Sequence, residues 1–290
     1  QMSKIQITPF FHEPTFTVTY VVTDRATSSC AIIDPVLDYD AAAGQISHEF
    51  ADKVVSYVDK NGLTLEWILE THAHADHLTA APYIKEKLGG LIGVGDHIRR
   101  VQSTFKAIYN LESTFPTDGS QFDQLFVDGE VITLGHLDME VLHTPGHTPA
   151  CVSYYIEDAV FVGDTLFMPD YGTARADFPN GSAQTLYQSI RKILALPEPT
   201  RMFVGHDYKS PTRDHFAWET SVIEQRRNNI HVKDGVSQAD FVAMREARDA
   251  TLAVPKLLLP AIQVNVRAGQ MPPAEDNGKC YLKIPLTVKS

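Results

Sequence analysis

The sequence predicts an α/β fold in which two β-sheets pack face to face between outer layers of helices, an αββα four-layer sandwich. Strand-like and helix-like segments alternate in both halves of the chain, and metal-binding side-chain types follow predicted strands in each half. The 290 residues, 43% of them hydrophobic, suffice for one large core. We expect residues 4–210 to form the sandwich and residues 211–290 to form a helical, proline-rich extension packed on it.

In the first half, runs of β-branched and aromatic residues alternate with segments whose apolar residues recur at helical spacing. Strands are expected at residues 5–8, 16–23, 30–33, 65–69 and 91–94. Helices are expected at residues 47–60, 78–88 and 96–110, the last with Asp96 as its N-cap.

In the second half, Asp128-Gly129-Glu130 lies between two short apolar runs and predicts a β-hairpin. Further strands are expected at residues 139–143, 152–156, 160–162 and 202–204. Helices are expected at residues 182–196, 213–228 and 237–249. A long loop spans residues 169–181, and a proline-rich tail with Pro255, Pro260, Pro272 and Pro273 follows the last helix.

Three imidazoles and one carboxylate lie within six residues, directly after the strand predicted at 65–69. These residues are His72, His74, Asp76 and His77. Neutral imidazole and carboxylate are ligands that Zn, Fe and Mn accept. The motif therefore predicts a metal site on a strand-to-helix turn.

Three later segments place a similar side chain on a turn or at a strand end. His147 lies on the Pro-Gly turn of residues 144–148, where the backbone is held stiffly. Asp164 follows Gly163, and His206 follows Gly205. Together with the first motif these residues are enough for two metal ions, so ligand counting leaves one-metal and two-metal sites open.

The composition excludes several classes of protein. The net charge of −11 argues against a nucleic-acid or anionic membrane surface as partner, and no run of about 18 apolar residues is present to span a membrane. The first residues lack the layout of a signal peptide. Cys30, Cys151 and Cys280 are widely spaced and odd in number, which predicts a reducing compartment. We expect a cytoplasmic protein; the sequence assigns these cysteines no role.

The pattern HxHxDH, then Gly-His, Gly-Asp and Gly-His in this order, resembles the metallo-β-lactamase fold superfamily between residues 72 and 206. Residues 144–151, 172–178 and 205–208 look like the corresponding segments of the persulfide dioxygenases. The stretch 259–269 is similar to a bacterial branch often labelled β-lactamase-like hydrolase. The resemblance implies a metallo-β-lactamase-like domain over residues 4–210.

The persulfide dioxygenase resemblance implies one Fe(II) per chain, held by His72, His147 and Asp164, with Zn or Mn as possible substitutes in purified material. It implies oxidation of glutathione persulfide with O2 to sulfite and glutathione, in sulfide detoxification. The four remaining residues would then orient the ligands. Alternatively they would hold a second ion, and the protein would be a di-zinc thioester hydrolase of the glyoxalase II kind. The four remaining residues, to which both alternatives apply, are His74, Asp76, His77 and His206.

Glutathione carries two carboxylates, which arginine can bind in a forked geometry. By match to the family's motifs we expect Arg175 and Arg267 to bind substrate, together with Tyr208 and Lys209. Asp177 is a further catalytic candidate, which either hydrogen-bonds metal-bound water or holds Arg175. A homodimer or a dimer of dimers is expected from the family's habit and the apolar tail.

Overall fold

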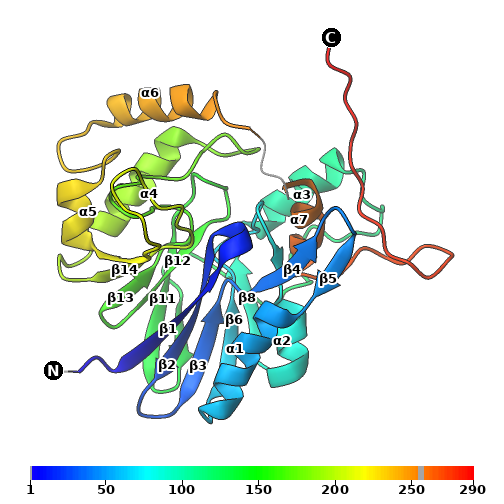
Figure 1. Ribbon diagram of the computed structural model, residues 1–290, viewed down its shortest axis with the longest axis horizontal. Coiled ribbons are helices and arrows are strands. Elements are labelled where there is room, and N and C mark those ends of the chain that lie inside the picture. The colour runs from blue at the N-terminus through cyan, green and yellow to red at the C-terminus, as the bar shows by residue number, and fades with distance from the viewer. Residues whose placement is uncertain (1, 254–257) are drawn as a thin grey trace.

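The computed structural model describes residues 2–253 and 258–290, and in them two β-sheets pack face to face with helices on both outer sides (Figure 1). The predicted αββα sandwich is thus confirmed. The first sheet consists, in spatial order, of β1 (Ile5–His12), β2 (Thr17–Asp24), β3 (Ser29–Ile33), β6 (Thr64–Leu69), β8 (Leu91–Gly95) and β9 (Gln124–Phe126). A small sheet beside it contains β5 (Gln45–Ser47), β4 (Val36–Asp40) and β7 (Leu78–Thr79).

The second sheet consists, in spatial order, of β10 (Val131–Leu134), β11 (Leu137–His143), β12 (Val152–Ile156), β13 (Ala159–Phe161), β14 (Arg201–Phe203) and β15 (Glu219–Ser221). Strands β13 and β14 are parallel neighbours. Asp164 and His206 each follow one of these two strands by three residues. Because the carboxyl ends of parallel strands meet at one edge of a sheet, the pairing brings the two side chains together.

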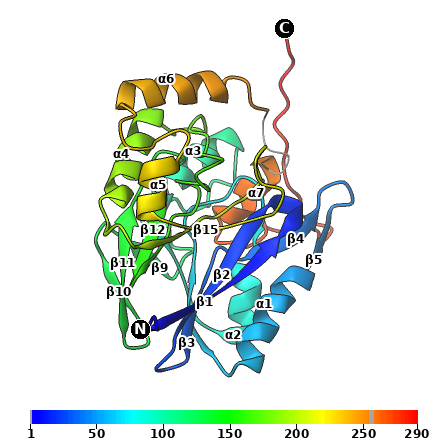
Figure 2. The same cartoon turned by 60° about the vertical axis from the view of Figure 1, so that its left-hand side comes forward.

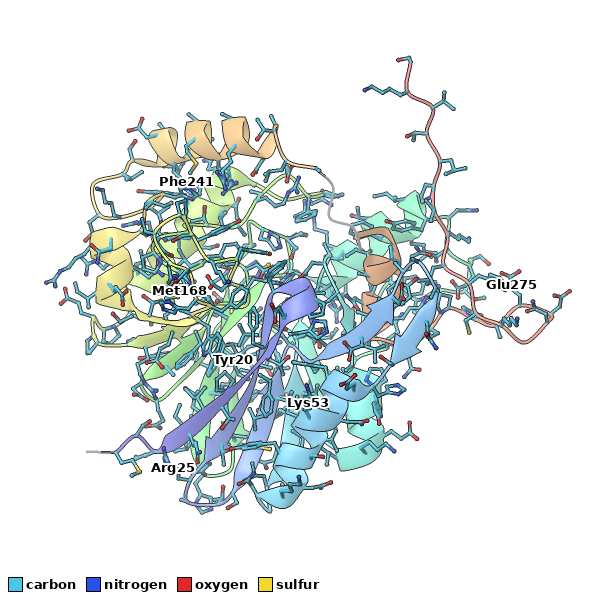
Figure 3. The ribbon with its side chains drawn as sticks, in the orientation of Figure 1. Tyr20, Arg25, Lys53, Met168, Phe241 and Glu275 are labelled. Atoms are coloured by element: carbon cyan, nitrogen blue, oxygen red, sulfur yellow. The ribbon has the colours of Figure 1, made fainter. Side chains whose placement is uncertain are left out.

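Apolar side chains from the facing surfaces of the two sheets form the central core. Tyr20, labelled in Figure 3, packs there against Phe161 and Phe203 with ring centroids 5.3 and 5.6 Å away. The buried hydroxyl of Tyr154 on β12 donates to the carbonyl oxygen of Glu70, just beyond β6, at 2.7 Å. This bond connects the second sheet to the chain just before residues 72–77, which are called the histidine motif below.

Helices cover both outer faces of the sandwich (Figure 2). The first sheet carries α1 (Glu49–Lys60), α2 (Ala81–Leu88) and α3 (Ile98–Ile108), whose apolar faces share one core cluster. The second carries α4 (Ala183–Leu194), α5 (Val222–Asn228) and α6 (Gln238–Asp249). Phe241, labelled in Figure 3, packs from α6 onto Tyr187 of α4. A 3-10 turn, η1 (Glu13–Thr15), joins β1 to β2. No helix within the described residues is long and apolar enough to cross a bilayer.

The residues after 210 are built into both halves of the sandwich. β15 pairs with β14 at the edge of the second sheet, and α6 packs against α4. A last helix, α7 (Leu258–Asn265), contacts β7, and its buried residues Ala261, Ile262 and Val264 join the core cluster beneath α1–α3. Val266 and Ala268 directly after α7 are still part of this core cluster. The chain then protrudes around Glu275 (Figure 3) and returns at Lys283, whose backbone N–H and carbonyl oxygen bond the side chain of Gln263.

The structure corrects the predicted hairpin around Asp128-Gly129-Glu130. β9 pairs in parallel with β8 in the first sheet, whereas β10 pairs with β11 in the second. Gly129 has a φ of 80°, so the turn signal is real. It carries the chain from one sheet to the other, and the hairpin lies instead at Gly135-His136, between β10 and β11.

Three predicted helix boundaries are also wrong. Residues 219–221 of the helix expected at 213–228 form strand β15, because the edge of β14 is available for pairing, and helix α5 begins only at Val222. His97, not Asp96, is the N-cap residue of α3. Leu78 and Thr79 form β7 before α2 begins. The proline-rich tail contains α7, and Pro255 lies outside the described residues.

Candidate metal centre

The histidine motif is held by Asp34, which lies at the end of β3 with a φ of 53°. Its carboxylate accepts hydrogen bonds from the backbone N–H and the hydroxyl of Thr71, both at 2.8 Å. It also lies 2.9 Å from Nε2 of His74. The side chains of His72 and His74 are 1% exposed and that of His77 is fully buried. One buried carboxylate therefore fixes the path of the loop and the orientation of one of its imidazoles.

His72, His147 and Asp164 form a compact three-donor group, in which the donor atoms all lie within 4.8 Å of one another. Nε2 of each histidine lies 3.4 Å from Oδ2 of Asp164. His147 follows Gly146, whose φ is 142° and where a Cβ atom would lie 2.3 Å from Cα of Leu186. Glycine is needed at this position so that the turn can approach α4 closely.

In both His72 and His147 the hydrogen bond is made by Nδ1, which leaves Nε2 free to bind a metal ion. Nδ1 of His147 donates to the carbonyl oxygen of Arg175 at 2.8 Å, so the proton is on Nδ1. Nδ1 of His72 lies 2.9 Å from the hydroxyl of Thr71, which donates its own proton to Asp34. Nε2 of His72 is buried and has no hydrogen-bond partner among the described residues. Two bare imidazole nitrogens beside a carboxylate oxygen fit a divalent Fe, Zn or Mn ion.

His206 joins two carboxylates. Its Nδ1 lies 2.6 Å from Oδ1 of Asp164, and its Nε2 contacts Oδ2 of Asp76. Burial alone would lower the pKa of His206, but the charges of Asp164 and Asp76 outweigh it and raise the pKa well above its ordinary value. His206 therefore holds the second oxygen of Asp164 and leaves Oδ2 facing His72 and His147.

His74, Asp76 and His77 form a second three-donor group within the same 4.8 Å limit. Nδ1 of His74 and Nε2 of His77 are buried without a hydrogen-bond partner in the part of the chain that is described. Asp76 is shared with His206. The structure thus brings together all seven motif residues, and the second group has free donor atoms of its own.

A cleft of about 610 Å³, including its open mouth, leads to this cluster and is of the size of small-molecule sites. Asp76, His147 and Asp164 of the cluster line it. Aromatic side chains form part of the wall, and they are Phe167, Tyr171, Phe178 and Tyr208. The cations that line it are Arg175, Arg245 and Arg248.

Asp177 binds Arg175, which is one of the two roles considered for it. Its carboxylate accepts from Nε and Nη2 of Arg175 at 2.7 and 2.9 Å, and hydrogen bonding to that guanidinium lowers the pKa of Asp177. Asp177 is not among the residues that line the metal cleft. It holds Arg175, whose carbonyl oxygen in turn orients His147.

Two of the expected substrate residues lie outside the cleft lining. Arg267 forms a forked ion pair with Glu112, at 2.9 and 2.5 Å, and its guanidinium lies 4.9 Å from the ring centre of Phe115. Lys209 turns away with a φ of 64°, and its ammonium lies 4.7 Å from the ring centre of Phe216. Tyr208 does line the cleft, and its ring lies parallel to His206 with centroids 6.0 Å apart.

Sequence reasoning missed three kinds of residue around the site. Asp34 could have been found, because it ends a strand directly before Pro35. Arg245 and Arg248 lie on a helix that was predicted, but the periodicity gives no sign that this helix borders the cleft. Asn265, which binds the histidine loop from α7, lies in the stretch 259–269, whose resemblance to the bacterial branch does not indicate a role for it.

A comparison with protein families places residues 12–206 in the metallo-β-lactamase superfamily. The chain belongs to this superfamily. Glyoxylase B2 of Dictyostelium discoideum is 54% identical over 98% of this chain and 97% of its own length. The mitochondrial persulfide dioxygenase ETHE1 of Bos taurus is 30% identical over 94% of this chain and 92% of its own. The crystal structure of ETHE1 from Myxococcus xanthus matches with a TM-score of 0.73 at 31% identity, covering 91% of this chain and 100% of that one.

Proposed function

We propose that the protein is a mononuclear iron dioxygenase that oxidises glutathione persulfide with O2 to sulfite and glutathione. The observation that carries the proposal is the group of His72, His147 and Asp164, in which both histidines offer a bare Nε2. Two histidines and one carboxylate on one face of an ion leave positions open for O2 and substrate together. Similarity to the persulfide dioxygenases over most of both chains supports the choice of substrate.

The reaction balances as one glutathione persulfide, one O2 and one water giving glutathione, sulfite and two protons. The bond between the two sulfur atoms breaks. The terminal sulfur gains three oxygen atoms, two from O2 and one from water, and the inner sulfur leaves as the thiol. Four electrons pass from sulfur to O2, so no further reductant is required.

Iron(II), when bound, supplies a redox-active centre where O2 and the persulfide sulfur can meet. The chain's part is to fix the ligands and to orient the substrate. Arg175, through its carbonyl oxygen, keeps the proton of His147 on Nδ1, and His206 fixes the Asp164 carboxylate. The aromatic side chains Phe167 and Tyr171 line the cleft and would give the reacting sulfur an apolar surrounding.

A di-zinc thioester hydrolase of the glyoxalase II kind is the second candidate. It is favoured by the bare nitrogens of His74 and His77 beside Asp76, and by the relative named glyoxylase B2. In that reaction water would cleave a glutathione thioester and O2 would not be consumed. The engagement of both ring nitrogens of His206 by carboxylates favours the one-ion site instead.

Paired assays separate the two candidates. Oxygen uptake on glutathione persulfide and hydrolysis of a glutathione thioester are measured on the same purified protein, reconstituted with Fe(II) or with Zn(II). Oxygen uptake by the iron form with negligible thioester cleavage by either form is the expected result. Thioester cleavage by the zinc form without oxygen uptake by the iron form would establish the hydrolase.

A further inference from the structure

The charges of two arginines at the cleft are already compensated by the chain itself. Arg175 binds Asp177 through two nitrogens, and its Nη1 donates to the carbonyl oxygen of Ala253 at 2.7 Å. Arg245 is 1% exposed and reaches Oδ1 of Asp249 at 2.8 Å from Nε and 2.7 Å from Nη2. Both guanidinium groups therefore hold the cleft wall together, and neither offers an uncompensated charge.

Arg245 and its partner are also part of the support of the site. Nη1 of Arg245 donates to the carbonyl oxygen of Thr173 at 2.9 Å, and Asp249 accepts from the backbone N–H of Ala176 at 2.9 Å. These two bonds fix the chain on either side of Arg175. Helix α6 is thereby attached to the loop that orients His147.

Arg248 lies about one turn after Arg245 on α6, and unlike Arg175 and Arg245 it has an uncompensated charge. It is exposed, lines the same cleft and has no ion-pair partner among the described residues. The positions three and four residues before it on α6, and three and four residues after it in the chain beyond the helix, have no carboxylate. They are Met244, Arg245, Thr251 and Leu252. Arg248 is therefore the uncompensated cation of the cleft wall in the described part of the chain.

We propose that Arg248 binds a carboxylate of the substrate and so selects persulfides whose carrier thiol is anionic, such as glutathione, over neutral ones. This inference rests on the proposed function. His147, Asp164 and Arg248 line the same cleft, so a ligand with its sulfur at the metal cluster shares this space with the guanidinium. Because the protein's net charge of −11 repels an anionic ligand, a local cation is needed, and a guanidinium matches a carboxylate with two parallel hydrogen bonds.

Binding of glutathione itself tests the inference without turnover. Isothermal titration of the iron-loaded protein is compared for wild type, Arg248→Gln, Arg248→Lys and the control Arg227→Gln. Arg227 is an exposed arginine of α5 outside the cleft lining, so its loss changes the net charge equally. We expect Arg248→Gln to weaken binding about 10- to 100-fold, the size of one charged hydrogen-bonded contact. Arg248→Lys should weaken it less, and Arg227→Gln less than twofold.

Glutathione diethyl ester gives the matched ligand control. Wild type should bind the ester more weakly than glutathione, and Arg248→Gln should cause no further loss of affinity for the ester.

In assays of persulfide oxidation, Arg248→Gln should raise KM and leave kcat nearly unchanged. Equal affinity of wild type and Arg248→Gln for glutathione, or an equal loss with the ester, would overturn the inference, as would no measurable binding by wild type. Absence of oxygen uptake by wild type would instead overturn the proposed function, and the binding experiment would still decide the role of Arg248.

Discussion

The side-chain amide nitrogen of Asn265 donates to the carbonyl oxygen of His74 at 2.9 Å, although 191 residues separate them in the chain. The same nitrogen donates to the carbonyl oxygen of His77 at 2.8 Å, and the amide oxygen accepts from the backbone N–H of Thr79 at 3.0 Å. The last helix of the chain thus closes the loop that carries the histidine motif.

Asn265→Ala should destabilise this loop. The substitution leaves two buried carbonyl groups and one buried N–H without their partner, and the expected cost is about 2–4 kcal/mol. Urea denaturation of the metal-free protein measures it, with Asn277→Ala as control. Asn277 is exposed, and its side chain bonds the hydroxyl of Tyr281 and the N–H of Lys279 near the protruding tail. A loss no larger than that of the control would show that α7 does not support the loop.

Asp164→Ala should remove iron and activity together. Asp164 supplies the carboxylate of the three-donor group, and without it His206 loses one of its two carboxylate partners. Iron content of anaerobically purified protein is measured by elemental analysis, with Asp128→Ala as a surface control that breaks an ion pair with Lys192. Undiminished iron in folded Asp164→Ala would rule out this ligand assignment.

His72→Ala and His74→Ala separate the ligand from its neighbour in the same motif. Nε2 of His72 is free and 3.4 Å from Asp164, whereas Nε2 of His74 faces Asp34 at 2.9 Å. We expect His72→Ala to lose most of the bound iron and His74→Ala to keep most of it per folded chain. Equal losses in the two variants would mean that His74 is a direct ligand, as the two-metal site requires.

Arg213→Ala should destabilise the segment that follows His206. Its guanidinium binds Asp170 at 2.9 and 3.0 Å and also the carboxylate of Asp207, which is 1% exposed. The substitution leaves the buried carboxylate of Asp207 without a cationic partner. We expect the free energy of unfolding to fall by about 3–5 kcal/mol at pH 7. Urea denaturation of the metal-free forms measures the difference.

The same pair of proteins gives a pH dependence with a defined sign. Hydrogen bonding to Arg213 is the main cause that lowers the pKa of Asp170 below its ordinary value. Because the pKa is lowered in the folded state, the ion pair of Asp170 with Arg213 stabilises the fold fully above the unfolded pKa of about 3.9. This contribution to stability is lost as the pH falls through the folded pKa. The difference in stability between wild type and Arg213→Ala should therefore shrink from pH 6 to pH 3. A difference that grows on acidification would contradict the role of Asp170.

The metal cluster could be predicted from sequence because each of its side chains follows a strand end or lies on a stiff turn, and strand topology then brings them together. His147 and Asp164 are examples, 17 positions apart in the sequence yet with donor atoms 3.4 Å from each other. The sequence predicts the turn at Gly129, but a local signal cannot tell a hairpin from a crossing between sheets. Arg248 and Asn265 could not be found, because helical periodicity does not say which residues of a helix border a distant loop.

Iron content and oxygen stoichiometry test the central claim most directly. The protein is purified without oxygen, its metals are counted, and O2 consumed and sulfite formed are measured against added glutathione persulfide. About one iron per chain, with one O2 consumed and one sulfite formed per persulfide, is the expected result. About two zinc ions per chain, with no oxygen uptake even after reconstitution with Fe(II), would contradict it.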